Sequence, residues 1–498
     1  MRRGTVLVAA IAVTAMICGA ATDSARSAAT LCVGAKAGCF PTIQAALGAA
    51  GNGDTIVIGP GSFAGGITIA KSVQLVGAGA GSTTIEGGGP VLTIGEVDGV
   101  DQPTVSVSRV TIAGGLNDSA PESFAASGGG VWIPPSFGNT AGATVSISDA
   151  LITGNRAAPE TAVPLCGHVC AFAAGGGINN AGTLTVANTG ITDNVAGSTA
   201  SDPSVASYAA GGGIMNAPQG ALTLLHSFVT GNRAAVSQPN GRNTDGGGIV
   251  SYGVLTVEDS VVSSNHSDVE AAVPSSFFSG LFTEANAGGL YLPQSSSTTI
   301  TRSRISGNSV HSTNTAGDAS AEAGGIDAEG SLLLTDSTVQ SNMAAAIVPA
   351  SSGFLAETDG GGIQVRGSAA VRDSRISHNS LSATSETGAA LASGGGLANI
   401  GGSLTLERTV VASNSASATG VGGFNLGGGI FNVLFGGGPP QLTETDSVIT
   451  ANRLAASDGV MSQGGGLYTV DPFSGQPFPV TMTRTVIEGN KPDQCVGC

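Results

Sequence analysis

Aromatic and charged side chains are scarce in this sequence of 498 residues. Aromatic residues make up 4% of the chain, with one Trp and four Tyr, and charged residues make up 10%. A core with so few rings must be built from small and β-branched side chains between closely spaced backbones. Clusters of Lys and Arg are missing too, which excludes the phosphate contacts of nucleic-acid binding. The net charge of −16 favours solubility and disfavours acidic polymers as partners.

Long apolar runs are also rare, and the one that stands out covers residues 6–17. It follows Arg2 and Arg3 and precedes small residues at 19–21 and 27–29. About a dozen apolar residues are short for a membrane span, so we predict a signal peptide over residues 1–29, with a retained anchor as the alternative. Ile17 stands before Cys18 where a lipoprotein signal needs a small residue. No second apolar span follows, so we expect a mature chain without a transmembrane span, secreted to the extracellular space or the cell surface.

Six of the seven cysteines would remain after cleavage. In an oxidising compartment they predict three short-loop disulfides. The couples are Cys32 with Cys39, Cys166 with Cys170, and Cys495 with Cys498. Zinc at Cys166, His168 and Cys170 is the alternative for the second couple, and a redox pair is the alternative for the third. We expect no metal and no cofactor.

Glycine is abundant, with 79 residues, and much of it recurs in one short pattern. A Gly-Gly run is followed by an aliphatic residue and, further on, by aliphatic-x-x-Asn. The asparagines are Asn155, Asn194, Asn232, Asn265, Asn308, Asn342, Asn379, Asn414, Asn452 and Asn490, at steps of 33 to 43 residues. Self-similarity in this range indicates a stacked repeat array rather than several globular domains.

Each repeat carries the pattern of short strands. A β-branched aliphatic stands three residues before every Asn, and further mostly apolar positions lie eight and ten residues before it. This two-residue spacing is typical of a strand with alternate side chains inward. The Gly-Gly-aliphatic segment predicts a third strand, so we expect three strands per turn and an internal ladder of stacked Asn amides. The strand-like spacing excludes arrays of helical repeats. A β-propeller is disfavoured because ten repeats exceed the usual four to eight blades.

The predicted fold is therefore all-β, a single-stranded parallel β-helix of about 12–13 coils. Thr42 begins a short Ala-rich capping helix in a predicted N-terminal cap over residues 30–55. The β-helix is predicted over residues 56–490 and a C-terminal cap over residues 491–498. Such a rod is expected to be a monomer.

The stretch from Thr42 to Gly88 resembles the cap and first coils of secreted β-helix proteins of the pectin-lyase-like superfamily. This resemblance implies a right-handed coil. The repeats resemble polymorphic outer-membrane-protein-type repeats, which pair Gly-Gly-x-Ile with an aliphatic-x-x-Asn. Those surface proteins usually continue into a C-terminal β-barrel or a sorting signal, and we expect neither for this chain.

The enzymes of this superfamily imply motifs that are largely missing. Asn243-Thr244-Asp245 matches the first polygalacturonase motif, but no Asp-Asp or Arg-x-Lys follows, and the only Gly-His is Gly167-His168. The residue sets of pectate lyases and pectin methylesterases are not found. We therefore assign no catalytic residue.

One column of polar residues, six positions before each Asn, remains as a candidate site. It includes Arg302, Asp336, Asp373 and Arg408 on consecutive repeats, which we single out as a candidate ligand-binding site. Neighbours would lie about 5 Å apart, so Asp336 and Asp373 would pair between the two arginines. A solvent-exposed ladder of alternating charges is the plainer interpretation; a cation site or a carboxylate pair for glycoside hydrolysis is the sharper one.

The length variation falls between each Asn and the next Gly-Gly, in Ala/Ser-rich stretches that we expect to form loops along one edge. Several carry an aromatic residue before the glycines, namely Phe172, Tyr208, Phe354 and Phe424. These rings either fasten the loop to the coil or stack on carbohydrate. We predict a non-catalytic, adhesin-like binding protein for polysaccharide or a cell-surface component, with a polysaccharide lyase or glycoside hydrolase as the alternative.

Overall fold

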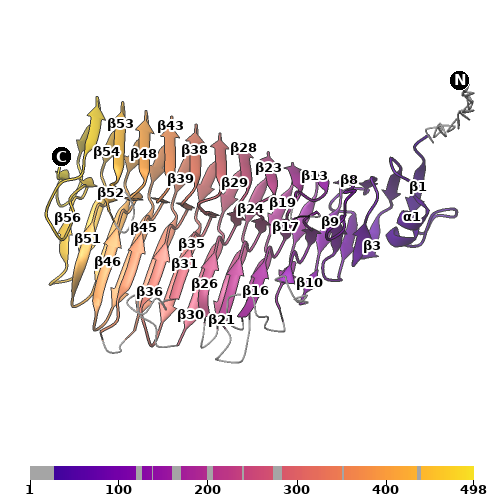
Figure 1. Cartoon of the computed structure of the whole chain (residues 1–498), viewed down its shortest axis with the longest axis horizontal. Coiled ribbons are helices and arrows are strands. Elements are labelled where there is room, and N and C mark those ends of the chain that lie inside the picture. The colour runs from indigo at the N-terminus through magenta and orange to yellow at the C-terminus, as the bar shows by residue number, and fades with distance from the viewer. Residues whose placement is uncertain are drawn as a thin grey trace, which may run out of the picture.

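Parallel strands stacked into a long rod form almost the whole molecule (Figure 1). The computed structural model describes residues 27–498 except 119–125, 137, 139, 160–169, 199–205, 238–240, 273–282, 350–352 and 435–438. The predicted signal peptide lies outside the described residues. All pairs between named strands are parallel, so the predicted parallel β-helix is confirmed.

Five sheets run along the rod, which we name A to E. In the described residues, sheets A, B and C contain 14, 13 and 13 strands, and sheets D and E contain ten each. All five occur together in ten consecutive turns, from β8 (Thr104–Ser108) to β57 (Leu467–Tyr468). The first and last strands are β1 (Thr30–Val33) and β58 (Val480–Thr483) in A, β3 (Gly61–Ala64) and β59 (Val486–Glu488) in B, β4 (Ile67–Ile69) and β60 (Cys495–Val496) in C, β10 (Leu116–Asn117) and β55 (Arg453–Ala456) in D, and β11 (Ala126–Ser127) and β56 (Met461–Gln463) in E.

One full turn passes through the sheets in the order C, A, B, D, E. A representative turn consists of β37 (Ile326–Ala328), β38 (Ser331–Thr335), β39 (Thr338–Gln340), β40 (Met343–Val348) and β41 (Ala356–Asp359). The prediction of three strands per turn was therefore wrong, because each of the ten turns from β8 to β57 contains five.

The main core lies between sheets A, B and C. Each sheet turns its aliphatic column inward, and the members stack from one turn to the next in register, as Ile300, Leu334 and Val371 do in sheet A. These side chains are fully buried and form one continuous cluster along the rod. The alternation read from the sequence is the inward and outward alternation of these strands.

Sheets D and E form a second, flatter lobe from the stretches expected to be loops. Figure 1 shows this lobe below sheets A, B and C and shows that the rod is narrower at its N-terminal end. Its interior is filled mainly by alanine, for example Ala344 and Ala346 of β40 against Ala321 and Ala356 of sheet E. Small side chains let two sheets approach closely, and they give a weak hydrophobic alternation, which explains why the sequence suggested loops.

A narrow neck joins the two lobes, with the Asn residues on one side and the glycines on the other. In every pair of successive turns, Asn Nδ2 donates to Oδ1 of the next Asn, as between Asn308 and Asn342 at 3.0 Å. A Cβ on Gly325 would lie 2.5 Å from the carbonyl of Gly362 and 3.0 Å from Nδ2 of Asn342. Only glycine permits this close approach of the two backbones, and the cross-section of the rod is narrow here as a result. The ladder runs through Asn155, Asn194, Asn232, Asn265, Asn308, Asn342, Asn379, Asn414, Asn452 and Asn490.

Both ends of the rod carry a disulfide. Helix α1 (Ile43–Ala49) is capped by Thr42, which accepts from the Ala45 amide, and its apolar side covers the first turn. Disulfides join Cys32 to Cys39 and Cys495 to Cys498. Cys166 lies outside the described residues, so its predicted disulfide with Cys170 stays a prediction. In the part of the chain that the structure describes, no helix is long and apolar enough to cross a membrane.

Candidate functional site

The pinched neck brings the outward faces of sheets C and E together at an angle. Glu322 at the end of β36 (Ala319–Glu322) contacts Gln364 on β42 (Ile363–Val365), with Nε2 donating to Oε2 at 3.2 Å. Side chains on the two sides of the glycine turn therefore meet outside the core. We call this place the acidic corner, after its carboxyl groups Asp245, Glu284, Glu322, Asp327, Glu329, Glu357 and Asp359.

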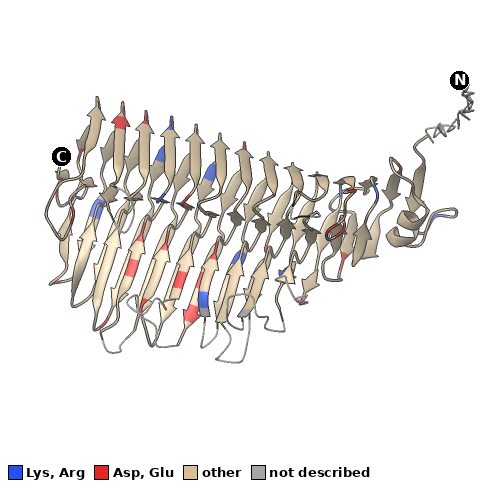
Figure 2. Ribbon diagram, in the orientation of Figure 1, with Lys and Arg blue, Asp and Glu red and all other residues tan. Residues whose placement is uncertain are grey.

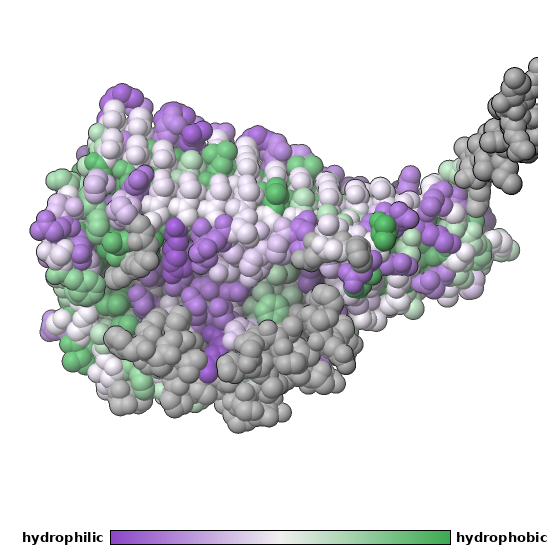
Figure 3. Space-filling view, in the orientation of Figure 1, coloured by the Kyte–Doolittle hydropathy of each residue, from purple (hydrophilic) through white to green (hydrophobic). Residues whose placement is uncertain are grey.

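Strand register arranges these groups in lines along the rod. On sheet E, β26 (Gly241–Asp245), β31 (Thr283–Asn286), β36 and β41 end in one ladder, which continues into β46 (Ala389–Ser393). Its members are Asp245, Asn286, Glu322, Asp359 and Ser393. On sheet C, the facing ladder contains Tyr291, Asp327 and Gln364. Figure 2 shows acidic residues on neighbouring strands of sheet E in the middle of the rod, and Figure 3 shows a hollowed hydrophilic area there.

Arg366 is the one cation that the described residues place among these carboxyl groups. Its guanidinium lies 2.5 Å from Glu322, 3.7 Å from Asp327 and 3.6 Å from Glu329. Glu329 also accepts a hydrogen bond from the hydroxyl of Tyr291 at 3.3 Å. A single guanidinium thus neutralises one of seven carboxyl groups, and the corner carries an excess of acid.

Several buried oxygens in the corner have no hydrogen-bond donor. Both carboxylate oxygens of Asp327, Oε1 of Gln364 and Oδ1 of Asn286 are buried without a hydrogen-bond partner. All four atoms are acceptors, and Asp327 and Gln364 are fully buried. Buried acceptors without donors are costly, so each requires an explanation.

Burial and mutual repulsion hold protons on several of these groups. Burial, opposed by the hydrogen bond from Asn286, raises the pKa of Asp245 to about 7. Burial with the charges of neighbouring carboxylates raises the pKa of Asp359 to about 7 and the pKa of Glu357 to about 8. The pKa values of Glu284 and Asp327 also lie well above the usual range, chiefly because of burial. Near neutral pH the corner therefore contains both carboxylic acids and carboxylates.

The main ladder of sheet E continues with Ala210 towards the N-terminus and Ser393 towards the C-terminus. The ladder of Glu284 and Glu357 beside it carries large apolar side chains in the turns further out. Towards the N-terminus, sheet E places Phe172 and Tyr208 there, with ring centroids 6.4 Å apart. Towards the C-terminus, the columns continue with Leu391 on sheet E and with Phe431 on sheet C, which stacks on Tyr468. The fold accepts apolar side chains at these positions, so it does not need the carboxyl groups.

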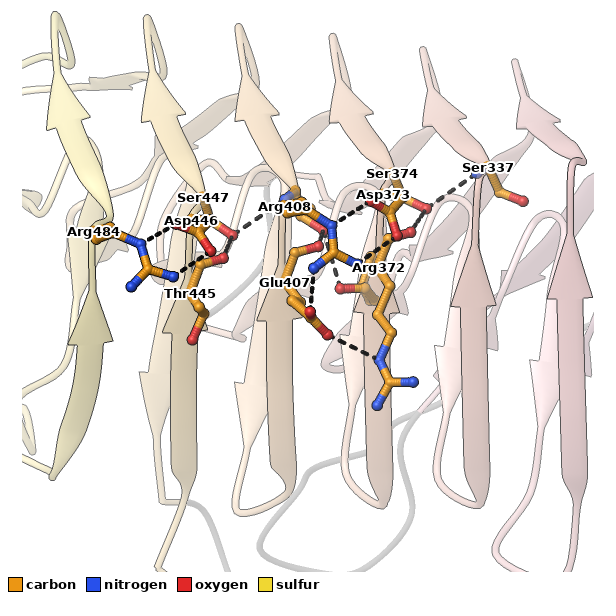
Figure 4. Close-up of polar contacts among 12 residues, drawn as sticks. Ser337, Arg372, Asp373, Ser374, Glu407, Arg408, Thr445, Asp446, Ser447 and Arg484 are labelled. Atoms are coloured by element: carbon orange, nitrogen blue, oxygen red, sulfur yellow. Dashed lines mark hydrogen bonds and ion pairs between the residues drawn. The ribbon is translucent and has the colours of Figure 1, made fainter.

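The predicted polar column lies elsewhere, at the turn between sheets A and B. Arg408 binds both carboxylate oxygens of Asp373, at 2.6 and 2.8 Å (Figure 4). Arg302 makes its contacts with the preceding coil and not with Asp336. There it binds both carboxylate oxygens of Asp259, at 2.9 and 2.8 Å. The guanidinium of Arg408 holds the pKa of Asp373 below its usual value. The four residues form parts of a charge ladder instead of one cluster, and ligand binding by this column stays a prediction.

Sequence reasoning missed the acidic corner because the repeats were aligned on Asn. Aligning them on the glycines instead would have placed an acid or amide before the turn in four consecutive repeats, at Asp245, Asn286, Glu322 and Asp359. In the sequence, Asp245 stands out only as part of a polygalacturonase-like tripeptide. Among the described residues, no group of three or more His, Cys, Asp or Glu side chains is arranged to hold a metal ion.

Comparisons with known proteins give distant matches. No protein-family model matches the chain, and no curated protein matches it. Among solved structures, the A-module of the Azotobacter vinelandii mannuronan C-5 epimerase AlgE4 matches with 11% identity and a TM-score of 0.33, over 92% of this chain and 94% of that one. The AlgE6 A-module matches with 14% identity and a TM-score of 0.29, over 91% and 95%. These values are too low to indicate an activity for this chain.

Proposed function

We propose that this chain binds a polysaccharide along the acidic corner, as a secreted or cell-surface protein. One observation carries the proposal: four consecutive turns place carboxyl and amide groups, three of them buried, in one ladder that continues with Ala210 on one side and Ser393 on the other. Burying charge without a full set of partners costs stability, so a functional use is the physical reason to retain it.

The geometry suits a chain-like carbohydrate. The polar groups follow the rod axis at the strand spacing of about 4.8 Å, so a linear polymer can meet equivalent groups in successive turns. Phe172 and Tyr208, with half-buried rings, lie on the ladder that leads through Asn243 to Glu284 and Glu357. Carbohydrate sites combine such apolar surfaces with a few convergent polar groups. The disulfides at both ends fit an oxidising compartment.

Binding is tested with the mature chain on a panel of neutral, cationic and anionic glycans. The double variant Asp327→Asn with Asp359→Asn should weaken binding of the best glycan at least about tenfold, because two buried groups are changed. Asp193→Asn is the matched control, since it removes an exposed carboxylate far from the corner. Unchanged binding by the double variant would refute the proposal.

Hydrolysis is the second candidate function. It is supported by carboxylic acids beside the salt bridge of Glu322 and Arg366. A protonated Glu357 or Asp359 would donate its proton to the glycosidic oxygen, while Glu322 takes a proton from the water that bonds to the anomeric carbon. Release of reducing ends from the bound glycan, lost in Glu322→Gln while binding remains, would establish it. Binding without any release leaves the non-catalytic function.

A further inference from the structure

We infer that the acidic corner selects a cationic glycan, an oligomer of amino sugars with free ammonium groups, over N-acetylated and uronate oligomers. This inference rests on the proposed function and names its substrate class. It stands on three features of the corner: its charge balance, its unpartnered acceptors and its linear shape.

The charge balance disfavours an anionic polymer. Six carboxyl groups share the corner with the pair of Glu322 and Arg366, and that arginine also approaches Asp327 and Glu329. Because Arg366 already pairs with Glu322 and lies near two further carboxyl groups, its charge is not available to a uronate. A carboxylate brought into this partly buried place would meet the ionised members of the corner and find no free cation, which is strongly unfavourable.

The unpartnered atoms of the acidic corner are oxygens, so a ligand that binds them must supply hydrogen-bond donors. Four buried oxygens of Asp327, Gln364 and Asn286 have no hydrogen-bond partner. An ammonium group offers three donors and no acceptor, whereas an N-acetyl group offers one donor and adds a carbonyl acceptor. Charge-assisted bonds to carboxylates are also about twice as strong as neutral ones. An amine therefore satisfies more of these atoms than its acetylated form.

A bare divalent cation fits less well. The described residues contain no group of three or more His, Cys, Asp or Glu side chains that could hold a metal ion. Instead the carboxyl groups are spread over four turns, from Asp245 on β26 to Asp359 on β41. Positive charges repeated along a polymer match such a line better than one central ion does. The rings of Phe172 and Tyr208 at one end give a sugar chain an apolar surface that a free polyamine would not use.

The test is calorimetric titration of the mature chain with five probes. These are a glucosamine hexamer, its N-acetylated form, a galacturonate hexamer, spermine and calcium chloride, at about pH 7, where amines still carry charge and groups of the corner begin to ionise. The glucosamine hexamer should bind at least about tenfold more tightly than the N-acetylated hexamer, and the galacturonate hexamer should not bind. In the variant with Asp327→Asn and Asp359→Asn, this preference should disappear, while Asp193→Asn should keep it.

The outcomes separate this inference from the proposed function. Equal binding of the N-acetylated hexamer, or tighter binding of galacturonate, overturns the cationic preference and leaves glycan binding in place. Spermine binding without any glycan binding supports recognition of ammonium groups and overturns the proposed function. Calcium binding that blocks the glucosamine hexamer identifies a metal site and overturns the inference. Circular dichroism of each variant checks that lost binding is not lost folding.

Discussion

Buried polar residues in this rod either stabilise or weaken the fold, depending on whether they have hydrogen-bond partners. Asn308 is fully satisfied: Oδ1 accepts from the amide and Nδ2 of Asn265, and Nδ2 donates to Asn342 and to the carbonyl of Val262. Glu444 is buried among the aliphatic residues of sheet A, and neither carboxylate oxygen has a hydrogen-bond partner. The first arrangement is expected to stabilise the fold and the second to weaken it.

Replacing Asn308 by Ala should therefore lower the free energy of unfolding by about 3 kcal/mol, because buried donors of Asn265 lose their acceptor. Urea titration measures the change. Thr299→Ala, a half-buried outward position on sheet A, is the control and should change stability by less than about 0.5 kcal/mol. Equal losses in the two variants would mean that the ladder contributes nothing of its own.

Glu444→Leu should stabilise the protein at alkaline pH. Leu406 and Met482 occupy the same column in the adjoining turns. Burial raises the pKa of Glu444 from 4.5 to about 7. The folded state thus holds its proton to higher pH than the unfolded chain does, so the stability contributed by this group falls as the pH rises between these values.

At pH 8 the gain from Glu444→Leu is expected to be about 3 kcal/mol, and near pH 4 it should shrink towards the simple hydrophobic term. Urea titrations at both pH values measure it. Glu488→Leu, at an exposed position of sheet B, should change stability by less than about 0.5 kcal/mol at either pH. A gain for Glu444→Leu that does not depend on pH would show that the carboxyl group is not buried in the charged state.

At the scale of elements, the sequence predicted the strands with large inward side chains and missed those with small ones. Sheets A, B and C were predictable because Ile, Val and Leu recur two residues apart. Sheets D and E were missed because alanine and serine alternate there, and their hydrophobic contrast is weak. The acidic corner depends on both of its sheets, since Glu322 comes from sheet E and Gln364 from sheet C. A site between a predicted sheet and an unpredicted one could not be assembled from the sequence.

The tight spacing of sheets D and E has a direct test in β40. Ala346 is fully buried between the sheets, whereas Ala345 points outward. Ala346→Leu should overpack this lobe and lower the free energy of unfolding by about 2 kcal/mol. Ala345→Leu adds the same atoms on the other face and should be nearly neutral. Thermal unfolding of both variants makes the comparison, and similar losses would contradict the assignment of the faces.

At the scale of the whole molecule, two sets of carboxyl groups respond to pH in opposite directions. Arg302, Arg408 and Arg484 lower the pKa values of their partners Asp259, Asp373 and Asp446, so this ladder stabilises the fold above about pH 4 and loses that effect as the pH falls. The acidic corner does the reverse. Its raised pKa values mean that folding becomes less favourable as the pH rises from the unfolded values towards 7 or 8.

The melting temperature should therefore be highest near about pH 5 and fall towards pH 8, because the corner groups must then ionise where they are buried. Calorimetry across this range measures it. The triple variant Asp245→Asn, Glu357→Gln and Asp359→Asn should melt at a higher temperature than the unaltered chain at pH 8 and should respond less to pH, whereas Asp193→Asn should follow the unaltered chain. A melting temperature that stays level or rises from pH 5 to pH 8 would mean that water or counter-ions already neutralise the corner. With the expected result, the carboxyl groups that weaken the free rod at neutral pH are the groups available to a cationic ligand.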